Sequence, residues 1–348
     1  MKFPTEGKMG APIFCNSFQF DNLLWDFLTH WPNAAFKEQV AASLYMDLSG
    51  DESLSNISDE VLEETKIDGK NYCVPISYNT VGIYYNVDMF EENGWEVPKT
   101  YEELISLCEQ IKTDGIIPIG LSNKMPGSVF QYASSLFYQM ESYDKFIEDT
   151  SQDKLNLDAY GEELKTVGER ILELNTYAQP DSMGAEDPQV VADFANGKVA
   201  MFISGSWQIP QITAANADMN FEMFTFPAQK EGEEIAGVFA GDFSLAVSAT
   251  AEHPEEIKKF LKYMSSTEAA EQFAETDGSA SCVKGVEYVA PQLQKQYEVI
   301  KQGRIASYPN EKWTGGTYYT EVGTNIQEML VSKDVDLWVQ SFSDIFKK

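Results

Sequence analysis

"GKVAMFISGSWQIPQI", residues 197–212, places a strand, a turn and a helix start in direct succession. The apolar run from Val199 to Ile203 has no polar alternation, which is typical of a strand buried on both faces. The small residues Ser204 to Ser206 then predict a turn, and Trp207 follows where a helix is expected to begin. Carboxyl ends of strands in a parallel sheet face the ligand crevice, so this turn predicts that Trp207 reaches a binding cleft.

The same alternation of strand and helix occurs before this stretch. In "VPKTYEELISLCEQIKTDGIIPIG", residues 97–120, Thr100 and Glu103 have capping-box spacing, which predicts a helix start. "IIPIG" then predicts a strand, and "VGIYYNVDMF", residues 81–90, predicts another. Asp187 as N-cap, with Pro188 at the first helical position, predicts the helix that leads into residues 197–212.

The alternation continues towards the C-terminus. "GDFSLAVSAT", residues 241–250, predicts a strand, and "HPEEIKKFLKYM", residues 253–264, predicts an amphipathic helix. The apolar residues expected on one face of that helix are Ile257, Phe260, Leu261 and Met264. Repeated alternation predicts an α/β fold with a parallel sheet.

Length and composition restrict the class of protein. The chain has 348 residues, which exceeds the usual size of a single core and favours two domains or two lobes. With 55 acidic and 25 basic residues, the net charge of -30 repels phosphate backbones and anionic lipids. We therefore expect neither a nucleic acid nor a membrane surface as partner.

The cysteines and the N-terminal segment carry weaker information. Cys15, Cys73, Cys108 and Cys282 lack the spacing of a metal knuckle or a redox motif, so we expect free, mostly buried thiols. The sequence shows no uninterrupted apolar stretch long enough for a membrane helix and no signal peptide at its start. Taken literally, this pattern argues for a cytoplasmic protein, whereas a sequence that begins late would look the same.

Enzyme signatures are absent from the sequence. There is no phosphate-binding loop, no G-x-S-x-G elbow and no H-E-x-x-H motif, and only His30 and His253 are present. We predict no catalytic residues, no metal and no cofactor. Glycosidase chemistry needs only a pair of carboxylates, so it stays open as an alternative.

Aromatic residues at loop-like positions are more informative. Trp31, Tyr78, Trp207 and Trp313 each stand outside the apolar stripes, and each has either a packing role or a ligand-binding role. Neighbouring side chains can exchange hydrogen bonds with hydroxyl groups; these are Asn33, Asn79, Ser206, Gln208 and Asp242. One apolar wall with a few polar groups suits a neutral, polyhydroxylated ligand.

Four blocks of the sequence resemble a known family in the same order. They are "DGKNYCVPISYNTVGIYYNVDMFEENGWEVPKTYEELISLCEQIKTDGIIPIG", "FANGKVAMFISGSWQIPQI", "GDFSLAVSATAEHPEEIKKFLKYMSSTEAAEQFAETDGSASC" and "SYPNEKWTGG". These blocks resemble extracellular solute-binding proteins of ABC importers, in the sugar-binding branch that includes maltose-binding protein. The resemblance spans roughly residues 27–348.

The resemblance implies a two-lobed α/β fold of the periplasmic-binding-protein type (type II), with a ligand cleft between lobes that close by a hinge motion. It implies crossovers near Tyr78–Gly82, Gly237–Asp242 and Ala306–Asn310. The implied lobes are residues 1–80 with 242–305, and residues 81–241 with 306–348. The first 25 residues match neither the strand nor the helix with which the family's first lobe begins, so those elements are missing or divergent here.

The resemblance also implies the site and the function. The expected ligand-binding residues are Trp31, Asn33, Tyr78, Asn79, Ser206, Trp207, Asp242 and Trp313. The expected function is non-enzymatic binding of a neutral oligosaccharide by a monomer that delivers it to an ABC permease. The implied location is extracellular, on a lipid anchor at the cell surface, or periplasmic. Alternatives are another cargo, such as an amino acid derivative or polyamine, and a carbohydrate-active enzyme.

Overall fold

The strand predicted in residues 197–212 lies in the middle of a mixed four-stranded sheet. The computed structural model describes residues 27–29, 32–152, 154–227, 231–232, 235–302, 304–306, 308–313 and 318–346. Its sheet has the order β5-β6-β4-β7, made by β4 (Val81–Asn86), β5 (Ile117–Gly120), β6 (Val199–Gly205) and β7 (Phe221–Phe224). All seven residues of β6 are buried, which confirms the predicted strand over Val199–Ile203. The strand continues through Ser204 and Gly205, however, where a turn was predicted.

The expectation of a parallel sheet is wrong in part. β5 and β6 are parallel, but β4 runs antiparallel to both β6 and β7. β4 enters the sheet directly from a crossover rather than through a strand-helix-strand unit, so no right-handed connection fixes its direction. The predicted strand over residues 81–90 is also shorter, because the chain turns into a helix at Val87.

Helices begin close to the predicted positions around this sheet. The Thr100–Glu103 capping box is confirmed, with both reciprocal hydrogen bonds formed. The N-cap of the next predicted helix is Glu186 instead of Asp187, which is the first helical residue. The helices of this region are α3 (Val87–Asn93), α4 (Tyr101–Thr113), α8 (Asp187–Ala195) and α9 (Ile209–Ala215).

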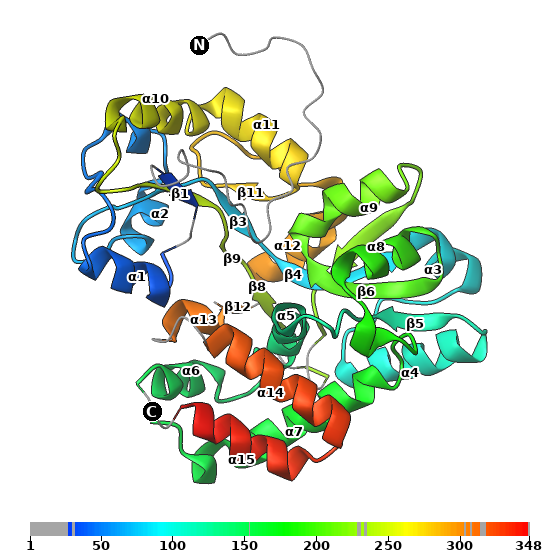
Figure 1. The fold of residues 1–348 in the computed structure, drawn as a ribbon. Coiled ribbons are helices and arrows are strands. Elements are labelled where there is room, and N and C mark those ends of the chain that lie inside the picture. The colour runs from blue at the N-terminus through cyan, green and yellow to red at the C-terminus, as the bar shows by residue number, and fades with distance from the viewer. Residues whose placement is uncertain are drawn as a thin grey trace.

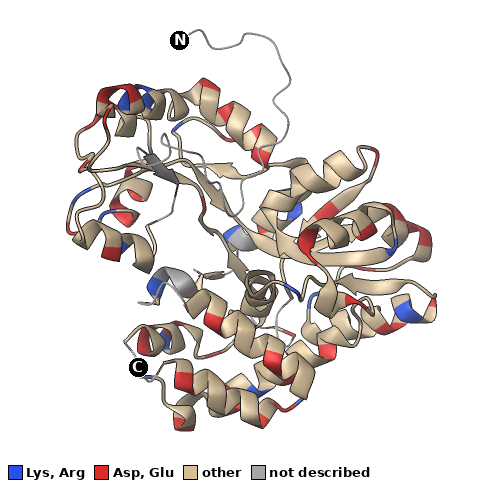
Figure 2. Cartoon of the chain, viewed as in Figure 1, with Lys and Arg blue, Asp and Glu red and all other residues tan. Residues whose placement is uncertain are grey.

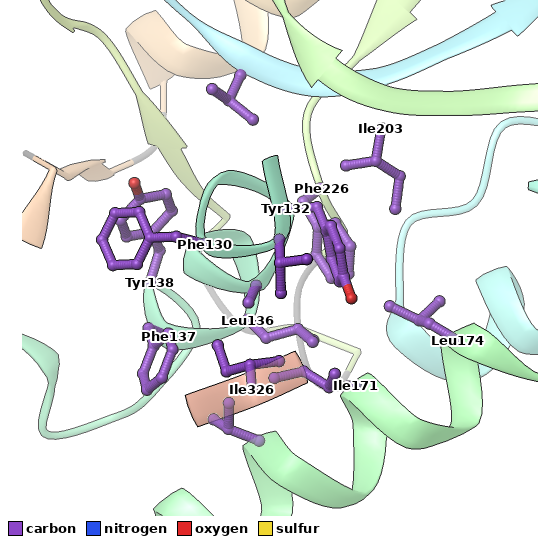
Figure 3. Close-up of a cluster of buried hydrophobic side chains, with 14 of the residues drawn as sticks. Phe130, Tyr132, Leu136, Phe137, Tyr138, Ile171, Leu174, Ile203, Phe226 and Ile326 are labelled. Carbon is purple, nitrogen blue, oxygen red and sulfur yellow. The ribbon is translucent and has the colours of Figure 1, made fainter. Parts of the chain in front are cut away.

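A bundle of helices forms the largest core. In Figure 3, Leu136 of one helix lies against Ile171 and Ile326 of two others, and Phe130 and Phe137 of the same helix belong to the same buried cluster. This bundle lies below the four-stranded sheet in Figure 1. Its helices are α5 (Pro126–Phe137), α6 (Tyr143–Ser151), α7 (Leu157–Asn175), α13 (Pro309–Lys312), α14 (Tyr318–Ser332) and α15 (Val335–Ile345).

A second, smaller unit contains the antiparallel sheet β1-β10-β2. Leu261 of α10 is fully buried against it, as predicted, whereas Phe260 is 39% exposed and does not share the buried face. The strands are β1 (Phe27–Thr29), β2 (Val74–Pro75) and β10 (Ser244–Val247), and the helices are α1 (Ala34–Ala41), α2 (Asp59–Glu64), α10 (Pro254–Met264) and α11 (Thr267–Asp277).

Short strands connect the two units where crossovers are predicted. β3 (Ser77–Asn79) lies between β11 (Ala280–Ser281) and β9 (Ala240–Gly241), and it leads towards β4 in Figure 1. β8 (Ala236–Val238) pairs in parallel with β12 (Arg304–Ala306). Short 3-10 helices are η1 (Glu52–Leu54), η2 (Ser182–Gly184), η3 (Ser206–Gln208) and η4 (Pro291–Leu293).

One segment packs differently from the predicted lobe boundary. Leu293 of η4 and Tyr297 of α12 (Gln294–Gln302) share a buried cluster with Tyr84 of β4 and Phe221 of β7. The predicted boundary assigns residues 242–305 to the first lobe, but these contacts join residues 290–297 to the sheet of the second. The remaining lobe boundaries stay a prediction.

Acidic residues are spread over most of the helices in Figure 2. Several accept hydrogen bonds from half-buried or buried tyrosine hydroxyls: Glu64 from Tyr78 at 2.6 Å, Glu173 from Tyr101 at 2.8 Å and Glu109 from Tyr177 at 2.6 Å. The thiols of Cys73, Cys108 and Cys282 are free and buried, as predicted, and Cys15 lies outside the described residues. None of the described helices has the length and hydropathy that crossing a membrane requires.

The close contact of α5 with α14 gives a test of this packing. A Cβ atom added to Gly323 would lie 2.0 Å from the carbonyl oxygen of Pro126, whereas one added to Gly161 of α7 would meet nothing. We expect Gly323→Ala to lower the free energy of unfolding by about 1–3 kcal/mol through overpacking. Gly161→Ala should raise it by about 0.5–1 kcal/mol. Urea denaturation measures both, and equal effects would contradict the packing described.

Candidate ligand-binding site

Trp207 is the second residue of the 3-10 helix η3, which begins at Ser206 directly after β6. The Trp207 ring folds back over Gly205. A Cβ atom added to Gly205 would lie only 2.1 Å from the indole Cη2 atom. A glycine is therefore required for this ring position. The ring is half-buried, so part of it stays available to a ligand, and the predicted place of Trp207 after the strand is confirmed.

Thr80 fixes the turn that carries Trp207. The backbone N-H of Ser206 donates to the Thr80 carbonyl at 2.9 Å, and the Ser206 hydroxyl accepts from the Thr80 N-H at 3.4 Å. The Thr80 hydroxyl donates to the Val238 carbonyl at 2.6 Å and accepts from the Gln296 amide at 2.8 Å. Since Ser206 is only 1% exposed, its hydroxyl supports the turn instead of facing a ligand, which differs from the predicted role.

Asn79 and Asp242 come together beside this turn. β3 pairs with β9, and the N-H of Asp242 donates to the Ser77 carbonyl at 3.0 Å, so Asp242 continues the edge of this small sheet. The Asn79 side chain donates a hydrogen bond to the Asp242 carboxylate and accepts one from the Tyr308 hydroxyl at 3.1 Å. Asn79 is buried, whereas part of Asp242 stays accessible.

The Asp242 carboxyl has an unusual environment. Burial among protein atoms, and next the charge of Asp277, raise its pKa to about 7, while the Asn79 hydrogen bond lowers it. Burial also raises the pKa of Asp277, the last residue of α11. Gly278 follows with a positive φ of 78° and lies against Ile209 of α9, so the end of α11 meets the turn of Trp207.

Two of the predicted aromatic residues are packing residues in this structure. Tyr78 is 9% exposed, stacks on Phe239 with ring centres 4.8 Å apart and donates to Glu64. Trp313 is 1% exposed, and its indole N-H donates to the Thr150 hydroxyl at 2.9 Å. The prediction that Trp313 lies at a cleft edge is therefore wrong here, because its ring fills the core of the helix bundle.

The two remaining predictions concern the first lobe. Asn33 caps α1 by accepting a hydrogen bond from the N-H of Phe36 at 3.0 Å, and its side chain is half-buried. Trp31 lies outside the described residues. Their ligand-binding roles stay predictions.

Three residues at the site were not predicted. Thr80, Asp277 and Tyr308 all contact or influence the predicted group, but none has a local motif that marks it. All three lie in blocks that carry the family resemblance, and Thr80 and Tyr308 also lie in predicted crossovers; these positions were the available signals. Burial and pairing across distant segments are required to identify all three.

Among the described residues, no cluster of three or more side chains suits a metal ion. His253 is the exposed N-cap of α10, and His30 lies outside the described residues. A half-exposed indole, an amide and two carboxylates can together stack on a ring and accept hydrogen bonds from hydroxyl groups.

Comparison with known proteins identifies the family of the chain. Residues 26–299 match the family model described as bacterial extracellular solute-binding protein. The chain is 30% identical over 271 residues to a multiple sugar-binding protein of Streptococcus mutans, and 26% identical over 275 residues to the maltodextrin-binding protein MdxE of Bacillus subtilis. Each alignment covers 75% of this chain and 63% of the relative, so the chain spans less than two thirds of these relatives.

Solved structures extend the comparison to the fold. RafE in complex with raffinose superposes with a TM-score of 0.81 at 26% identity, over 92% of this chain and 85% of that one. The apo form of RafE from Streptococcus pneumoniae gives 0.75 at 26% identity, over 92% and 83%. The predicted two-lobed α/β fold of the periplasmic-binding-protein type is confirmed. The chain belongs to the family of bacterial extracellular solute-binding proteins.

Proposed function

We propose that this protein binds a neutral oligosaccharide and delivers it to the permease of an ABC importer. The observation that carries the proposal is the half-buried Trp207 ring on the turn that Thr80 holds, next in sequence to Asn79, whose side chain pairs with Asp242. Relatives named for binding multiple sugars, maltodextrin and raffinose support it. Family members are binding proteins, which supports a role without catalysis.

The site's chemistry suits hydroxyl groups that donate hydrogen bonds. A carboxylate accepts such bonds, and an indole face covers the apolar side of a sugar ring. Asp242 contributes the acceptor from one crossover, while Trp207 contributes the wall from the second lobe. A ligand that contacts both would draw the lobes together, since closure is stabilised only by contacts that the open form lacks.

The comparison with RafE suggests a first ligand to test. The chain superposes better on the raffinose complex than on the apo form, with TM-scores of 0.81 and 0.75. The conformation of this chain is therefore nearer to that of a sugar complex, in which we expect both lobes to contact the ligand. Raffinose is therefore the probe that we choose for the measurements below.

One alternative is supported by a specific observation. The charge of Asp277 raises the energetic cost of ionising Asp242, and a cationic cargo such as an amino acid derivative or polyamine would relieve it. A thermal-shift panel of sugars, amino acids and polyamines separates the cargo classes, because a ligand at 100 times its Kd adds about 2.7 kcal/mol to stability. Release of monosaccharides from raffinose during the same incubation would instead indicate an enzyme.

The setting of the function follows from family and charge. We propose a monomer that works outside the membrane, in the periplasm or on a lipid anchor at the cell surface. The net charge of -30 supports a partner other than nucleic acid. Residues 1–80 with 242–305, apart from the segment that packs on the four-stranded sheet, would form one lobe, and Trp31 and Asn33 would extend the ligand site from it.

Removing the Trp207 ring tests the stacking wall. Trp207→Ala should weaken raffinose binding by about 1–3 kcal/mol, because the ligand loses an apolar contact area. Isothermal titration calorimetry measures the change. Tyr263→Ala is the matched control, since it removes a ring that is 53% exposed on α10 and should leave binding unchanged. Unchanged affinity in Trp207→Ala would exclude this site.

The pH dependence of binding tests Asp242. Its carboxyl has a pKa of about 7 before the ligand binds, and sugar hydroxyls donate preferentially to the ionised form. Affinity for raffinose should therefore rise as the pH rises through 7 and level off above it, with proton release on binding below pH 7. Calorimetry in two buffers of different ionisation enthalpy measures both quantities.

Asp242→Asn provides the comparison for this titration. The variant should bind more weakly, and its affinity should not change between pH 6 and about 8. Asp336→Asn, which removes an exposed carboxylate bound to Lys165 at 2.8 Å, should keep the wild-type pH profile. A wild-type affinity that falls as the pH rises would contradict the assignment of Asp242 as an acceptor.

A further inference from the structure

A chain of hydrogen bonds joins one residue from each of the three crossovers. Tyr308 follows β12 and donates its hydroxyl proton to the amide oxygen of Asn79 in β3, at 3.1 Å. The Asn79 side chain in turn donates to the carboxylate of Asp242, which follows β9. In the sequence, Asp242 follows Asn79 by 163 positions and Tyr308 follows it by 229 positions, yet the Asn79 amide binds both.

The direction of the chain depends on the orientation of the Asn79 amide. An amide has an accepting oxygen on one side and a donating nitrogen on the other. With its oxygen bound by Tyr308, its nitrogen faces Asp242; the opposite orientation would place an oxygen against a carboxylate. Tyr308 itself is firmly held, because it is 9% exposed and packs edge-on against Tyr138 with ring centres 6.4 Å apart.

We propose that Tyr308 is a positioning residue for ligand binding: its hydroxyl fixes the Asn79 amide, which orients the Asp242 carboxylate towards the ligand. The ligand half of this proposal rests on the proposed function, whereas the hydrogen-bond chain does not. The three residues belong to three crossovers. A change in the relative placement of these segments therefore changes the orientation of the Asp242 carboxylate that the ligand meets.

The other groups around Asp242 disfavour its charged form, so the Asn79 amide matters for its ionisation. Asp277 of α11 faces the carboxylate and carries the same charge, and the Cys282 thiol after β11 is buried nearby and stays protonated. Among the described groups that act on Asp242, the Asn79 amide is the one that favours the charged form. Losing its orientation should therefore raise the pKa of Asp242.

The test compares two tyrosines whose hydroxyls each share a hydrogen bond with an asparagine. Tyr308→Phe removes the partner of Asn79, and Tyr132→Phe removes the buried hydroxyl that accepts from Asn175 at 3.2 Å inside the helix bundle. Both variants keep the ring, so both should fold and lose similar stability. The full chain is used, with raffinose as the probe in calorimetry and with the carboxyl carbon signal of Asp242 followed by NMR without ligand.

Tyr308→Phe should weaken raffinose binding about tenfold and raise the midpoint of the Asp242 titration by roughly half to one pH unit. Tyr132→Phe should change neither quantity. If Tyr308→Phe leaves both at wild-type values, or if Tyr132→Phe changes them equally, the positioning role is wrong.

A second variant makes the result independent of raffinose. Asn79→Ala should raise the Asp242 midpoint as well, and adding Tyr308→Phe to it should produce no further rise, because the chain is already broken. If wild-type protein does not bind raffinose but the midpoint moves as described, the hydrogen-bond chain stands and the proposed function fails. Additive changes in the double variant would overturn the chain, whatever the ligand.

Discussion

Thr80 has no exposed surface, and three different segments bind its polar atoms. Ser206 pairs with its backbone, Val238 accepts from its hydroxyl and Gln296 donates to it. A buried backbone must have its hydrogen bonds satisfied, and a chain that passes repeatedly between two lobes buries several such segments at one place. The turn of Trp207, the crossover at β8 and helix α12 therefore depend on a single residue for their common position.

The sequence predicted the features whose causes are local. The apolar run from Val199 to Ile203, the Thr100–Glu103 capping box and the tryptophan after β6 each follow from a few neighbouring residues. The resemblance added the order of the lobes and the crossovers. Asn79 and Asp242 were predicted both from their polar side chains near aromatic residues and from the resemblance, and the structure brings them together.

The features that escaped prediction depend on contacts between distant segments. Trp313 was expected at the cleft edge, but its neighbourhood is built by Thr150 and Phe346, which no local pattern connects to it. Asp277 reaches the site because α11 ends against α9. The direction of β4 is likewise decided by where the crossover enters the sheet, and the apolar composition of the strand is the same in either direction.

Tyrosine hydroxyls donate hydrogen bonds to several carboxylates of this chain. With 55 acidic and 25 basic residues, the chain has too few cations, and Tyr78, Tyr101 and Tyr177 supply neutral donors instead. Dissolved salt weakens attraction between opposite charges, but it has much less effect on a hydrogen bond from a neutral group. Salt also relieves repulsion among the many surface carboxylates. Rising ionic strength should thus strengthen this fold, which would suit the proposed location outside the membrane, in a medium whose salinity the cell does not control.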